Sequence, residues 1–323
     1  MRIVDLFSGC GGMSLGFQKA GFEIVSAFDN WDQAIEVYRA NFSHPIFKMN
    51  LMDVERAVDS VSAYNPDMII GGPPCQDFSS AGKRDEDNGR GDLTVAFAKI
   101  VAQVRPQWFV MENVARIVKT RKLEEASRIL KMEGYGLTKM VLNASKCGVP
   151  QKRMRFFMIG KIGEDDDFLS NILISSQSDK EMTVADYFGD KLDVEYYYRH
   201  PRSYARRGIF SVHEPSPTIR GVNRPMPTGY QIHPTDPIVN KEGIRPLTTK
   251  ERSEIQTFPE EFRFVGTKTN IEQMIGNAVP VNLARFVGCA INNYVGEPVF
   301  DNSRDYSIPL TTLWDASEPY GSD

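Results

Sequence analysis

The sequence predicts an α/β protein, with a mostly parallel β-sheet covered by helices and a smaller, more irregular lobe. In the first half of the chain, short apolar runs alternate with segments of helical periodicity, which is typical of parallel sheets. From about residue 181 to 270, Pro, Gly, Arg and Thr dominate and helical periodicity is weak. An apolar stretch of helical character follows at 280–292, and we expect it to pack back on the sheet.

The predicted elements are short and bounded by turn residues. We expect strands at 2–7, 23–28, 67–71, 107–111, 137–142 and 155–160. We expect helices at 12–20, 31–41, 92–104 and 121–133, with Gly21, Gly134 and Gly136 placed where helices end. Because ligands of such sheets bind at the carboxyl ends of the strands, functional residues are expected there.

The length of 323 residues suits a main domain with a smaller lobe. We assign residues 1–180 and 271–323 to the main domain and residues 181–270 to the lobe and its hinge. The tail after about residue 300 is polar and is assigned no role. No apolar run approaches the ~20 residues that a membrane span needs, and the first strand is not preceded by a signal-peptide layout. We therefore expect a cytoplasmic protein without a membrane partner.

Charge is segregated along the chain, although the net charge is only −4 and the isoelectric point about 5.7. Residues 161–195 hold ten acids and three lysines, whereas residues 199–225 hold six arginines and one acid. The basic stretch can face phosphates, and a solvated loop is an equal alternative. The four cysteines, at 10, 75, 147 and 289, form neither a CxxC pair nor a His-spaced cluster, so we expect no metal site and no disulfide framework.

A glycine-rich turn follows the first predicted strand, in the sequence DLFSGCGG at residues 5–12. Glycines let backbone N–H groups approach a ligand closely, which suits a nucleotide-like cofactor with a carboxylate tail. Asp29 ends the next strand, where an acid can accept hydrogen bonds from ribose hydroxyls. The structural alternatives are a plain turn for the glycines and a helix N-cap for Asp29, and the two roles of Asp29 can coexist.

A cysteine stands just after another predicted buried strand, in the sequence GGPPCQDFSS at residues 71–80. Two prolines hold Cys75 rigidly in a position that we expect to be exposed, whereas a structural cysteine more often lies inside an apolar run. Only roughly a few per cent of an unperturbed thiol is thiolate at pH 7, so a reactive Cys75 needs a base, a positive neighbour or a helix N-terminus. The polar residues 77–92 indicate a loop that can close over a substrate.

Two further segments place charged groups at strand ends. Glu112 and Asn113 end the strand that begins near Trp108, and a carboxyl there is either a satisfied structural group or an acid–base group. In QKRMR (151–155), Arg153 and Arg155 point to one side of an extended chain. The alternatives for the arginines are ion pairing or contact with a DNA backbone.

Taken in order, these motifs resemble those of the C5-cytosine DNA methyltransferase family, in its bacterial restriction–modification type. They are DLFSGCGG (5–12), PPCQ (73–76), ENV (112–114), QKRMR (151–155), RPLT (245–248) with FP (258–259), and IGNAVP (275–280). The resemblance covers residues 1 to about 290 and implies a Rossmann-like, S-adenosylmethionine-dependent methyltransferase domain with a small target-recognition lobe. It also implies methyl transfer to carbon 5 of cytosine in a short, specific sequence of double-stranded DNA.

The resemblance assigns catalytic roles to five residues. Cys75 matches the nucleophile that adds to carbon 6 of a flipped-out cytosine, so that carbon 5 can accept the methyl group. Glu112 matches the acid that contacts N3 and the exocyclic amine, a role that requires a pKa raised by burial. Arg155 matches the arginine that contacts the base carbonyl. Arg153 is expected to support Arg155 or the nearby backbone, and Asn113 is expected to fix the turn before Cys75.

The resemblance also assigns the cofactor site. The expected contacts are Phe7, Ser8, Gly9, Gly11, Gly12, Asp29, Asn30, Asn50, Leu51, Pro73, Leu93, Asn277, Ala278 and Val279. Asn30 departs from the family, because some members place an aromatic ring against adenine there, and Trp31 is the available substitute. Asn50 stands where an aspartate often contacts the adenine amine. An amide oxygen accepts the same bond, so we expect altered affinity rather than lost binding.

The loop 76–92 and the lobe are expected to clamp duplex DNA, with arginines on its phosphates. The expected DNA contacts are Gln76, Ser79, Arg90, Arg206, Arg207, Thr218, Ile219, Arg220 and Arg224. Thr218 and Ile219 resemble the Thr–aliphatic pair of the family's recognition lobe. The side chains of Arg220 and Arg224 can read guanine edges.

Other interpretations stay open. A tRNA cytosine-5 methyltransferase would share the motifs, but its recognition-lobe signature is not found here. A catalytically inactive DNA-binding relative is disfavoured by the presence of Cys75, Glu112 and Arg155. An unrelated α/β protein with a structural cysteine is disfavoured by the full motif order. We expect a monomer, with a cognate restriction endonuclease as a functional rather than a necessary physical partner.

Overall fold

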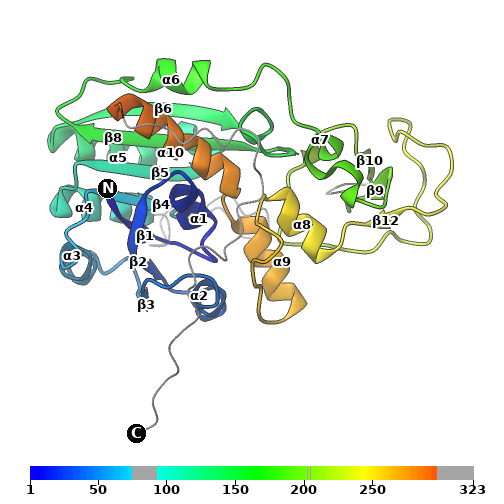
Figure 1. Cartoon of the computed structure of the whole chain (residues 1–323), viewed down its shortest axis with the longest axis horizontal. Coiled ribbons are helices and arrows are strands. Elements are labelled where there is room, and N and C mark those ends of the chain that lie inside the picture. The colour runs from blue at the N-terminus through cyan, green and yellow to red at the C-terminus, as the bar shows by residue number, and fades with distance from the viewer. Residues whose placement is uncertain (75–92, 202, 204, 297–323) are drawn as a thin grey trace, which may run out of the picture.

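A computed structural model describes residues 1–74, 93–201, 203 and 205–296 of the protein. Its main body is a seven-stranded sheet in the order β3-β2-β1-β4-β5-β8-β6 (Figure 1). The strands are β1 (Arg2–Leu6), β2 (Glu23–Asp29), β3 (Ile46–Lys48), β4 (Met68–Gly71), β5 (Trp108–Val114), β6 (Tyr135–Asn143) and β8 (Met154–Ile162). Neighbours from β3 to β5 pair in parallel, and β8 runs antiparallel to both β5 and β6. The α/β class predicted from the sequence is therefore confirmed.

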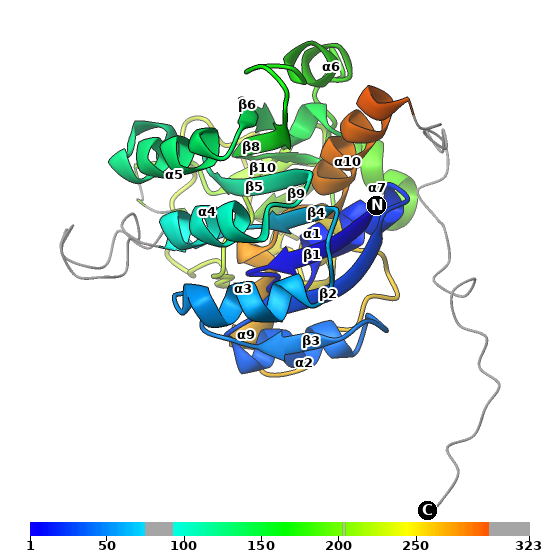
Figure 2. The same ribbon diagram turned by 90° about the vertical axis from the view of Figure 1, so that its left-hand side faces the viewer.

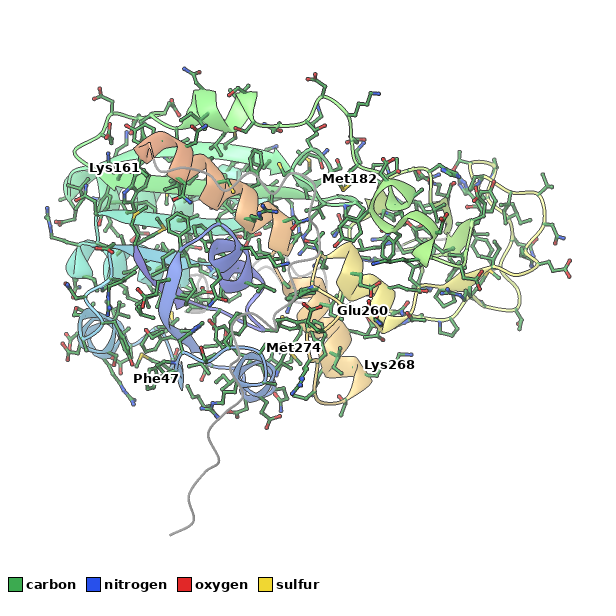
Figure 3. The ribbon with its side chains drawn as sticks, in the orientation of Figure 1. Phe47, Lys161, Met182, Glu260, Lys268 and Met274 are labelled. Atoms are coloured by element: carbon green, nitrogen blue, oxygen red, sulfur yellow. The ribbon has the colours of Figure 1, made fainter. Side chains whose placement is uncertain are left out.

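Helices cover both faces of this sheet. They are α1 (Gly12–Lys19), α2 (Asp32–Arg39), α3 (Val54–Ser62), α4 (Leu93–Val104), α5 (Arg121–Met132), α6 (Ser170–Ser175) and α10 (Val281–Val295). Side chains alternate between the faces of a strand, so Ile3 packs with α1, α6 and α10, whereas Val4 packs with α3, α4 and α5. Figure 2 shows these two helical layers on opposite sides of the strands. In Figure 3, Phe47 marks the edge strand β3, and Lys161 marks β8, next to the opposite edge strand β6.

A smaller set of strands lies beyond the main sheet, at the right of Figure 1. β9 (Tyr196–Tyr198), β10 (Ile209–Ser211) and β12 (Arg245–Pro246) form a sheet in the order β10-β9-β12. A two-stranded pairing of β11 (Ser216–Pro217) with β7 (Gln151–Lys152) joins this part to the segment before β8. The remaining helices are α7 (Val184–Phe188), α8 (Thr249–Ile255) and α9 (Lys268–Asn277), with short 3₁₀ turns η2 (Ala115–Lys119), η3 (Ala144–Lys146) and η4 (Gly189–Lys191).

The predicted strands and helices occur where they were expected, with ends displaced by one to three residues at most. The strands and α-helices that were missed are β3, α3, β7, α6, α7, β9, β10, β11, β12, α8 and α9. Of these, the helices α7 and α8 lie within residues 181–270, where weak helical structure was expected. The division at residues 180 and 270 remains a prediction, and the tail after residue 300 lies outside the described part of the chain.

The stretch Lys268–Val295, which contains α9 and α10, is long and apolar enough to cross a membrane by length and composition alone. In its most apolar window, however, 67% is buried inside the protein. Leu283, Val287 and Ile291 of α10 lie in the core beneath β1 and β4. α10 is therefore a buried core helix that packs on the sheet, as expected for residues 280–292.

Candidate active site

The chain turns sharply where β1 ends. Phe7, Gly9 and Gly11 all have positive φ, at 57°, 54° and 94°. A Cβ at Gly11 would lie 2.3 Å from the Phe42 ring, and one at Gly12 would lie 2.4 Å from the carbonyl oxygen of Val279. Larger residues would therefore clash at both positions, and the glycines let the start of α1 approach the segment around residue 279.

Asp29, at the end of β2, holds this turn in place. Its Oδ2 accepts a hydrogen bond from the Gly9 N–H and its Oδ1 one from the Trp31 N–H, both at 2.8 Å. Burial raises the pKa of Asp29, and the hydrogen bonds from backbone N–H groups oppose that shift. The N-cap residue of α2 is Trp31, so Asp29 is not the helix cap, although it binds the Trp31 N–H. Asp29 lines the space beside the glycine turn, and its contact with ribose hydroxyls stays a prediction.

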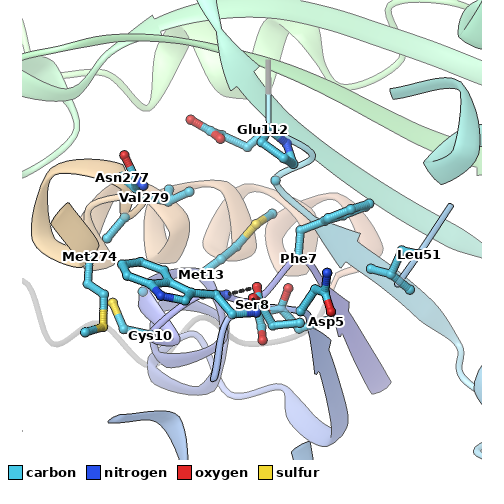
Figure 4. A pocket seen from close by; sticks show the side chains of 18 of the residues that line it. Asp5, Phe7, Ser8, Cys10, Met13, Leu51, Glu112, Met274, Asn277 and Val279 are labelled. Atoms are coloured by element: carbon cyan, nitrogen blue, oxygen red, sulfur yellow. Dashed lines mark hydrogen bonds between the residues drawn. The ribbon is translucent and has the colours of Figure 1, made fainter. Parts of the chain in front are cut away.

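A cavity of about 490 Å³ opens beside the glycine turn, at the carboxyl ends of the strands (Figure 4). Most of the residues expected at the cofactor line it, namely Phe7, Ser8, Gly9, Gly12, Asp29, Asn30, Asn50, Leu51, Leu93, Asn277, Ala278 and Val279. Gly11 and Pro73 do not line it, and their assignment to the cofactor stays a prediction. Gly11 faces the ring of Phe42, and Pro73 is buried with its carbonyl on Asn113.

Several lining residues were not predicted. They are Asp5, Cys10, Met13, Met49, Gly72, Pro74 and Met274. Trp31, named above only as a substitute, and Glu112, named above only as a catalytic group, line the cavity as well. Asp5 is fully buried, and among the described residues its Oδ1 has no hydrogen-bond partner. Its Oδ2 accepts a 2.5 Å hydrogen bond from Ser14, whose hydroxyl lies 2.7 Å from that of Tyr38. Burial raises the pKa of Asp5 to about 8.

A carboxylate–arginine pair lies at the end of β5. Glu112 Oε1 and Arg155 Nε are 2.9 Å apart, and the two side chains are 10% and 14% exposed. Burial raises the pKa of Glu112, while Arg155 and Arg153 act to lower it. Figure 4 shows the Glu112 carboxyl at the rim of the cavity. The site therefore places a buried acid, held by a cation, beside the space that the glycine turn encloses.

Asn113 fixes the backbone next to this pair. Its Nδ2 donates to the carbonyl oxygen of Pro73 at 3.0 Å, and its Oδ1 accepts from the Val114 N–H at 2.8 Å. Pro74 lines the cavity and is the last described residue before the gap. Cys75 follows Pro74 in the sequence and lies outside the described residues.

Arg153 lies near the Glu112–Arg155 pair, since both arginines act to lower the pKa of Glu112, but its hydrogen bonds go elsewhere. Its side chain is 0% exposed, and its guanidinium donates to the carbonyl oxygens of Ile219, Gly276 and Ala278 at 3.0, 2.9 and 3.0 Å. It does not line the cavity. These contacts agree with one of the two roles expected for Arg153, support of nearby backbone, and its listing among the catalytic groups stays a prediction.

The residues expected to contact DNA lie in different environments. Gln76, Ser79 and Arg90 are outside the described part of the chain. Arg206 and Arg224 are exposed. Arg207 instead pairs with Glu214 and lies over the Phe210 ring, 4.2 Å from its centroid. Thr218 donates to the carbonyl oxygen of Lys152 at 2.9 Å.

Ile219 and Arg220 are held by the protein itself. Ile219 is 3% exposed and packs in the core of the small lobe, so its side chain does not present a surface to DNA in this structure. Arg220 donates to the carbonyl oxygen of His200, and its own carbonyl oxygen accepts from Arg252. These hydrogen bonds hold the backbone of the segment in place, and the expectation of DNA contact by Thr218 and Arg220 stays a prediction.

An α/β sheet with a glycine turn, a buried acid and a nucleotide-sized cavity at its carboxyl edge defines a cofactor-binding enzyme of the Rossmann-like class. Residues 1–293 match the model of the family described as C-5 cytosine-specific DNA methylase, and the chain belongs to that family. The described residues contain no group of three or more His, Cys, Asp or Glu side chains that could hold a metal ion.

Relatives in restriction–modification systems match almost their full length. The type II methyltransferase M.HindV of Haemophilus influenzae is 60% identical over 300 residues, which cover 93% of this chain and 99% of that protein. M.HgiDI of Herpetosiphon aurantiacus is 56% identical over 298 residues, with coverages of 92% and 96%. The structure of Dnmt2 methyltransferase from S. pombe superimposes with a TM-score of 0.68 at 17% identity, covering 91% of this chain and 99% of that one. The protein is therefore a DNA (cytosine-5-)-methyltransferase of the type II restriction–modification class.

Proposed function

We propose that the protein transfers a methyl group from S-adenosylmethionine to carbon 5 of cytosine in a short, specific sequence of double-stranded DNA, with Cys75 as nucleophile. The observation that carries the proposal is that the expected catalytic acid and the expected cofactor-binding residues line one cavity. Glu112, which is paired with Arg155, lines the same cavity as the glycine turn and Asp29. A base held at Glu112 would therefore lie next to a cofactor held at Asp29.

The cavity fits S-adenosylmethionine by its donor set. The Asp29 carboxylate suits the ribose hydroxyls, the Asn50 amide and Leu51 suit the adenine edge, and Trp31 offers a flat apolar wall. The unpartnered Oδ1 of Asp5 is available to a polar or cationic group of the methionine end. When bound, S-adenosylmethionine supplies an electrophilic methyl group on a sulfonium.

The chemistry follows from the poor nucleophilicity of carbon 5 in an aromatic cytosine. The Cys75 thiolate forms a C–S bond to carbon 6 while Glu112 delivers a proton to N3, so that carbon 5 becomes enamine-like and takes the methyl group. A base then removes the carbon-5 proton, the C–S bond breaks as the thiolate leaves, and the N3 proton returns to the Glu112 carboxylate. The raised pKa of Glu112 favours the protonated form that this role needs, and Arg155 orients the carboxyl and contacts the base carbonyl.

The other thiols are unsuited to this role. Burial raises the pKa of both Cys10 and Cys147 to about 12, and it raises that of Cys289 as well. A thiol with such a pKa is almost entirely protonated near pH 7 and is a weak nucleophile. We therefore assign the reaction to Cys75, which directly follows the cavity-lining residue Pro74 in the sequence.

The target cytosine must leave the duplex to reach this site, at a cost of roughly a few kcal/mol for unstacking and unpairing. Exposed cations such as Arg206 and Arg224 would hold the phosphates on either side. We further propose that the protein acts as a cytoplasmic monomer and protects DNA against a cognate restriction endonuclease.

The test is methylation of a mixed duplex library by purified protein with S-adenosylmethionine, followed by bisulfite sequencing. Wild type should mark cytosines in one short sequence, and Cys75→Ser should leave no marks. Cys289→Ser, the same change at a half-buried thiol of α10, is the matched control and should retain wild-type marks.

Three results would contradict the proposal. Marks left by Cys75→Ser at the wild-type level would exclude Cys75 as the nucleophile. Methylation of tRNA but not of DNA by the wild-type protein would assign it to the RNA branch of the family. Methylation of neither would favour an inactive relative that only binds DNA.

A further inference from the structure

Three polar side chains are fully buried where the main sheet meets the smaller lobe. Gln151, Arg153 and Gln256 are each 0% exposed. Gln151 Nε2 donates to Gln256 Oε1 at 2.7 Å, and Arg153 Nη1 lies 3.5 Å from Gln151 Oε1. These three residues are called the buried hub below. None of them lines the cavity, so none can touch a cofactor directly.

One side of the buried hub holds residues 218–221, called here the recognition segment. The Ile219 N–H donates to Gln151 Oε1 at 2.8 Å, and the Ile219 carbonyl oxygen accepts from Arg153 Nη1 at 3.0 Å. Both backbone groups of this residue therefore bind the hub. The recognition segment carries Thr218 and Arg220, which the sequence assigns to DNA reading.

The other side of the buried hub holds residues 275–279, called here the cofactor segment. Arg153 Nη2 donates to the carbonyl oxygens of Gly276 and Ala278 at 2.9 and 3.0 Å. Gln256 Nε2 donates to the carbonyl oxygen of Ala278 at 3.1 Å and to that of Ile275. Asn277, Ala278 and Val279 of this segment line the cavity.

The two segments also touch each other directly. A Cβ at Gly276 would lie 2.2 Å from the backbone nitrogen of Gly221 and 2.4 Å from the carbonyl carbon of Arg220. The cofactor segment and the recognition segment are therefore in backbone contact, with no side chain between them. A shift of either one must move the other or break hydrogen bonds of the hub.

Buried polar groups are costly to leave unpaired, and networks of them behave as a unit. The hub satisfies three carbonyl oxygens of the cofactor segment and both backbone groups of Ile219 with only three side chains. Occupation of the cavity should restrict residues 277–279, and the hub transmits that restriction to Ile219. Coupling of this kind is reciprocal between two ligands.

We propose that Gln256, acting through Gln151 and Arg153, is a positioning residue that couples cofactor binding to the reading of the DNA sequence. The inference rests on the proposed function, in that the cavity holds S-adenosylmethionine and the recognition segment meets DNA. Gln256 is chosen because its amide bridges Gln151 and the cofactor segment, and because its loss leaves the Glu112–Arg155 pair untouched.

The experiment measures the affinity for a duplex containing the target sequence, by fluorescence anisotropy, with and without saturating S-adenosylhomocysteine. Wild type should bind roughly tenfold or more tightly with the cofactor product, within the usual range of coupling. Gln256→Met keeps the length of the side chain but removes its hydrogen bonds. In this variant the ratio of DNA affinities with and without S-adenosylhomocysteine, called here the coupling factor, should be close to one. The affinity for S-adenosylhomocysteine alone should change far less.

Asn282→Ala is the matched control, because Asn282 follows the same segment and donates to the carbonyl oxygen of Gly148 at 2.8 Å without reaching the hub. It should keep the wild-type coupling factor. The inference is overturned if Gln256→Met keeps that factor too, or if wild type binds its target specifically but shows no coupling. Absence of specific DNA binding by wild type would instead contradict the proposed function itself, and the inference with it.

A second measurement needs no variant, should Gln256→Met fail to fold. Hydrogen exchange of wild type is followed with and without S-adenosylhomocysteine. The Ile219 amide, which donates to Gln151, should exchange several-fold more slowly with the ligand. The Ile209 amide of the same lobe donates to Asp236 at 3.0 Å outside the hub and should not change. Equal responses of the two amides, or no response at Ile219, would overturn the inference.

Discussion

At the scale of single residues, Asp5 carries a clear pH signature. Its pKa is raised to about 8 in the folded protein from an ordinary value of 3.8, because burial disfavours the charged form. Between these values the folded state binds a proton that the unfolded state has released. The free energy of unfolding from this group is therefore largest below about pH 4 and falls as the pH rises towards 8, by up to roughly 1.4 kcal/mol per pH unit.

Asp5→Asn should remove the part of the decrease in the free energy of unfolding with rising pH that Asp5 causes. Urea denaturation of wild type and variant at pH 5, 6.5 and 8 should give a difference that grows with pH in favour of the variant. Asp67→Asn is the control, since Asp67 is an exposed acid just before β4 that accepts from the Arg2 N–H at 2.7 Å. A difference between Asp5→Asn and wild type that does not depend on pH would show that Asp5 is not protonated in the folded state.

The candidate site also shows which residues a sequence can and cannot predict. Motif order singled out Asp29, Glu112 and residues of the glycine turn, all of which the fold brings to one cavity. It assigned Arg153 to catalysis and did not single out Gln256, whose amide Nε2 binds main-chain carbonyl oxygens. A hydrogen bond to a backbone carbonyl leaves no pattern in the partner's sequence, so such contacts require the fold.

At the scale of elements, the contact of α1 with α10 supports the glycine turn. A Cβ at Gly16 of α1 would lie 2.5 Å from both the Ala284 Cβ and the Val281 carbonyl oxygen of α10. Alanine would favour a helix by about 1 kcal/mol over glycine. The clash with the backbone of α10 should outweigh that gain, because overpacking of this kind costs about 1–3 kcal/mol.

Gly16→Ala should therefore lower the free energy of unfolding by up to about 2 kcal/mol, as measured by urea denaturation, once the helix gain is subtracted from the overpacking cost. Its affinity for S-adenosylhomocysteine should fall as well, because α1 begins at the turn that lines the cavity. Gly229→Ala is the control, since a Cβ there meets nothing within 4 Å. Equal or greater stability of Gly16→Ala would mean that α10 can move away freely.

Elements differed in how far their sequences revealed them. The long strands and amphipathic helices have strong periodicity, whereas β3 has only three residues, of which Ile46 alone is buried. α3 carries a clear amphipathic pattern, with Val54, Ala57, Val58 and Val61 packed on the core, so its sequence held a usable signal although it was not among the predicted helices. α8 also carried a usable signal, because Thr248 and Glu251 form a capping box, a pattern readable from sequence.

At the scale of the whole molecule, charge distribution matters more than the net charge of −4. The acids of 164–167 lie at the amino edge of the sheet, where Lys131 near the end of α5 pairs with Asp166 beside the start of β6. Glu112 and the cavity lie at the carboxyl edge. An acidic protein can therefore bind DNA on one side if cations of the smaller lobe, such as Arg224, meet phosphates.

This arrangement predicts a local rather than a global response to salt. Each phosphate contact contributes about 0.9 to the slope of log affinity against log salt concentration. Arg224→Ala should reduce that slope by roughly one for target and non-target duplexes alike, if Arg224 binds a phosphate. Lys131→Ala removes the same charge at the opposite edge of the sheet and should leave the slope unchanged. A loss confined to the target duplex would assign Arg224 to a base edge instead, and equal slopes for wild type and both variants would remove Arg224 from the DNA interface.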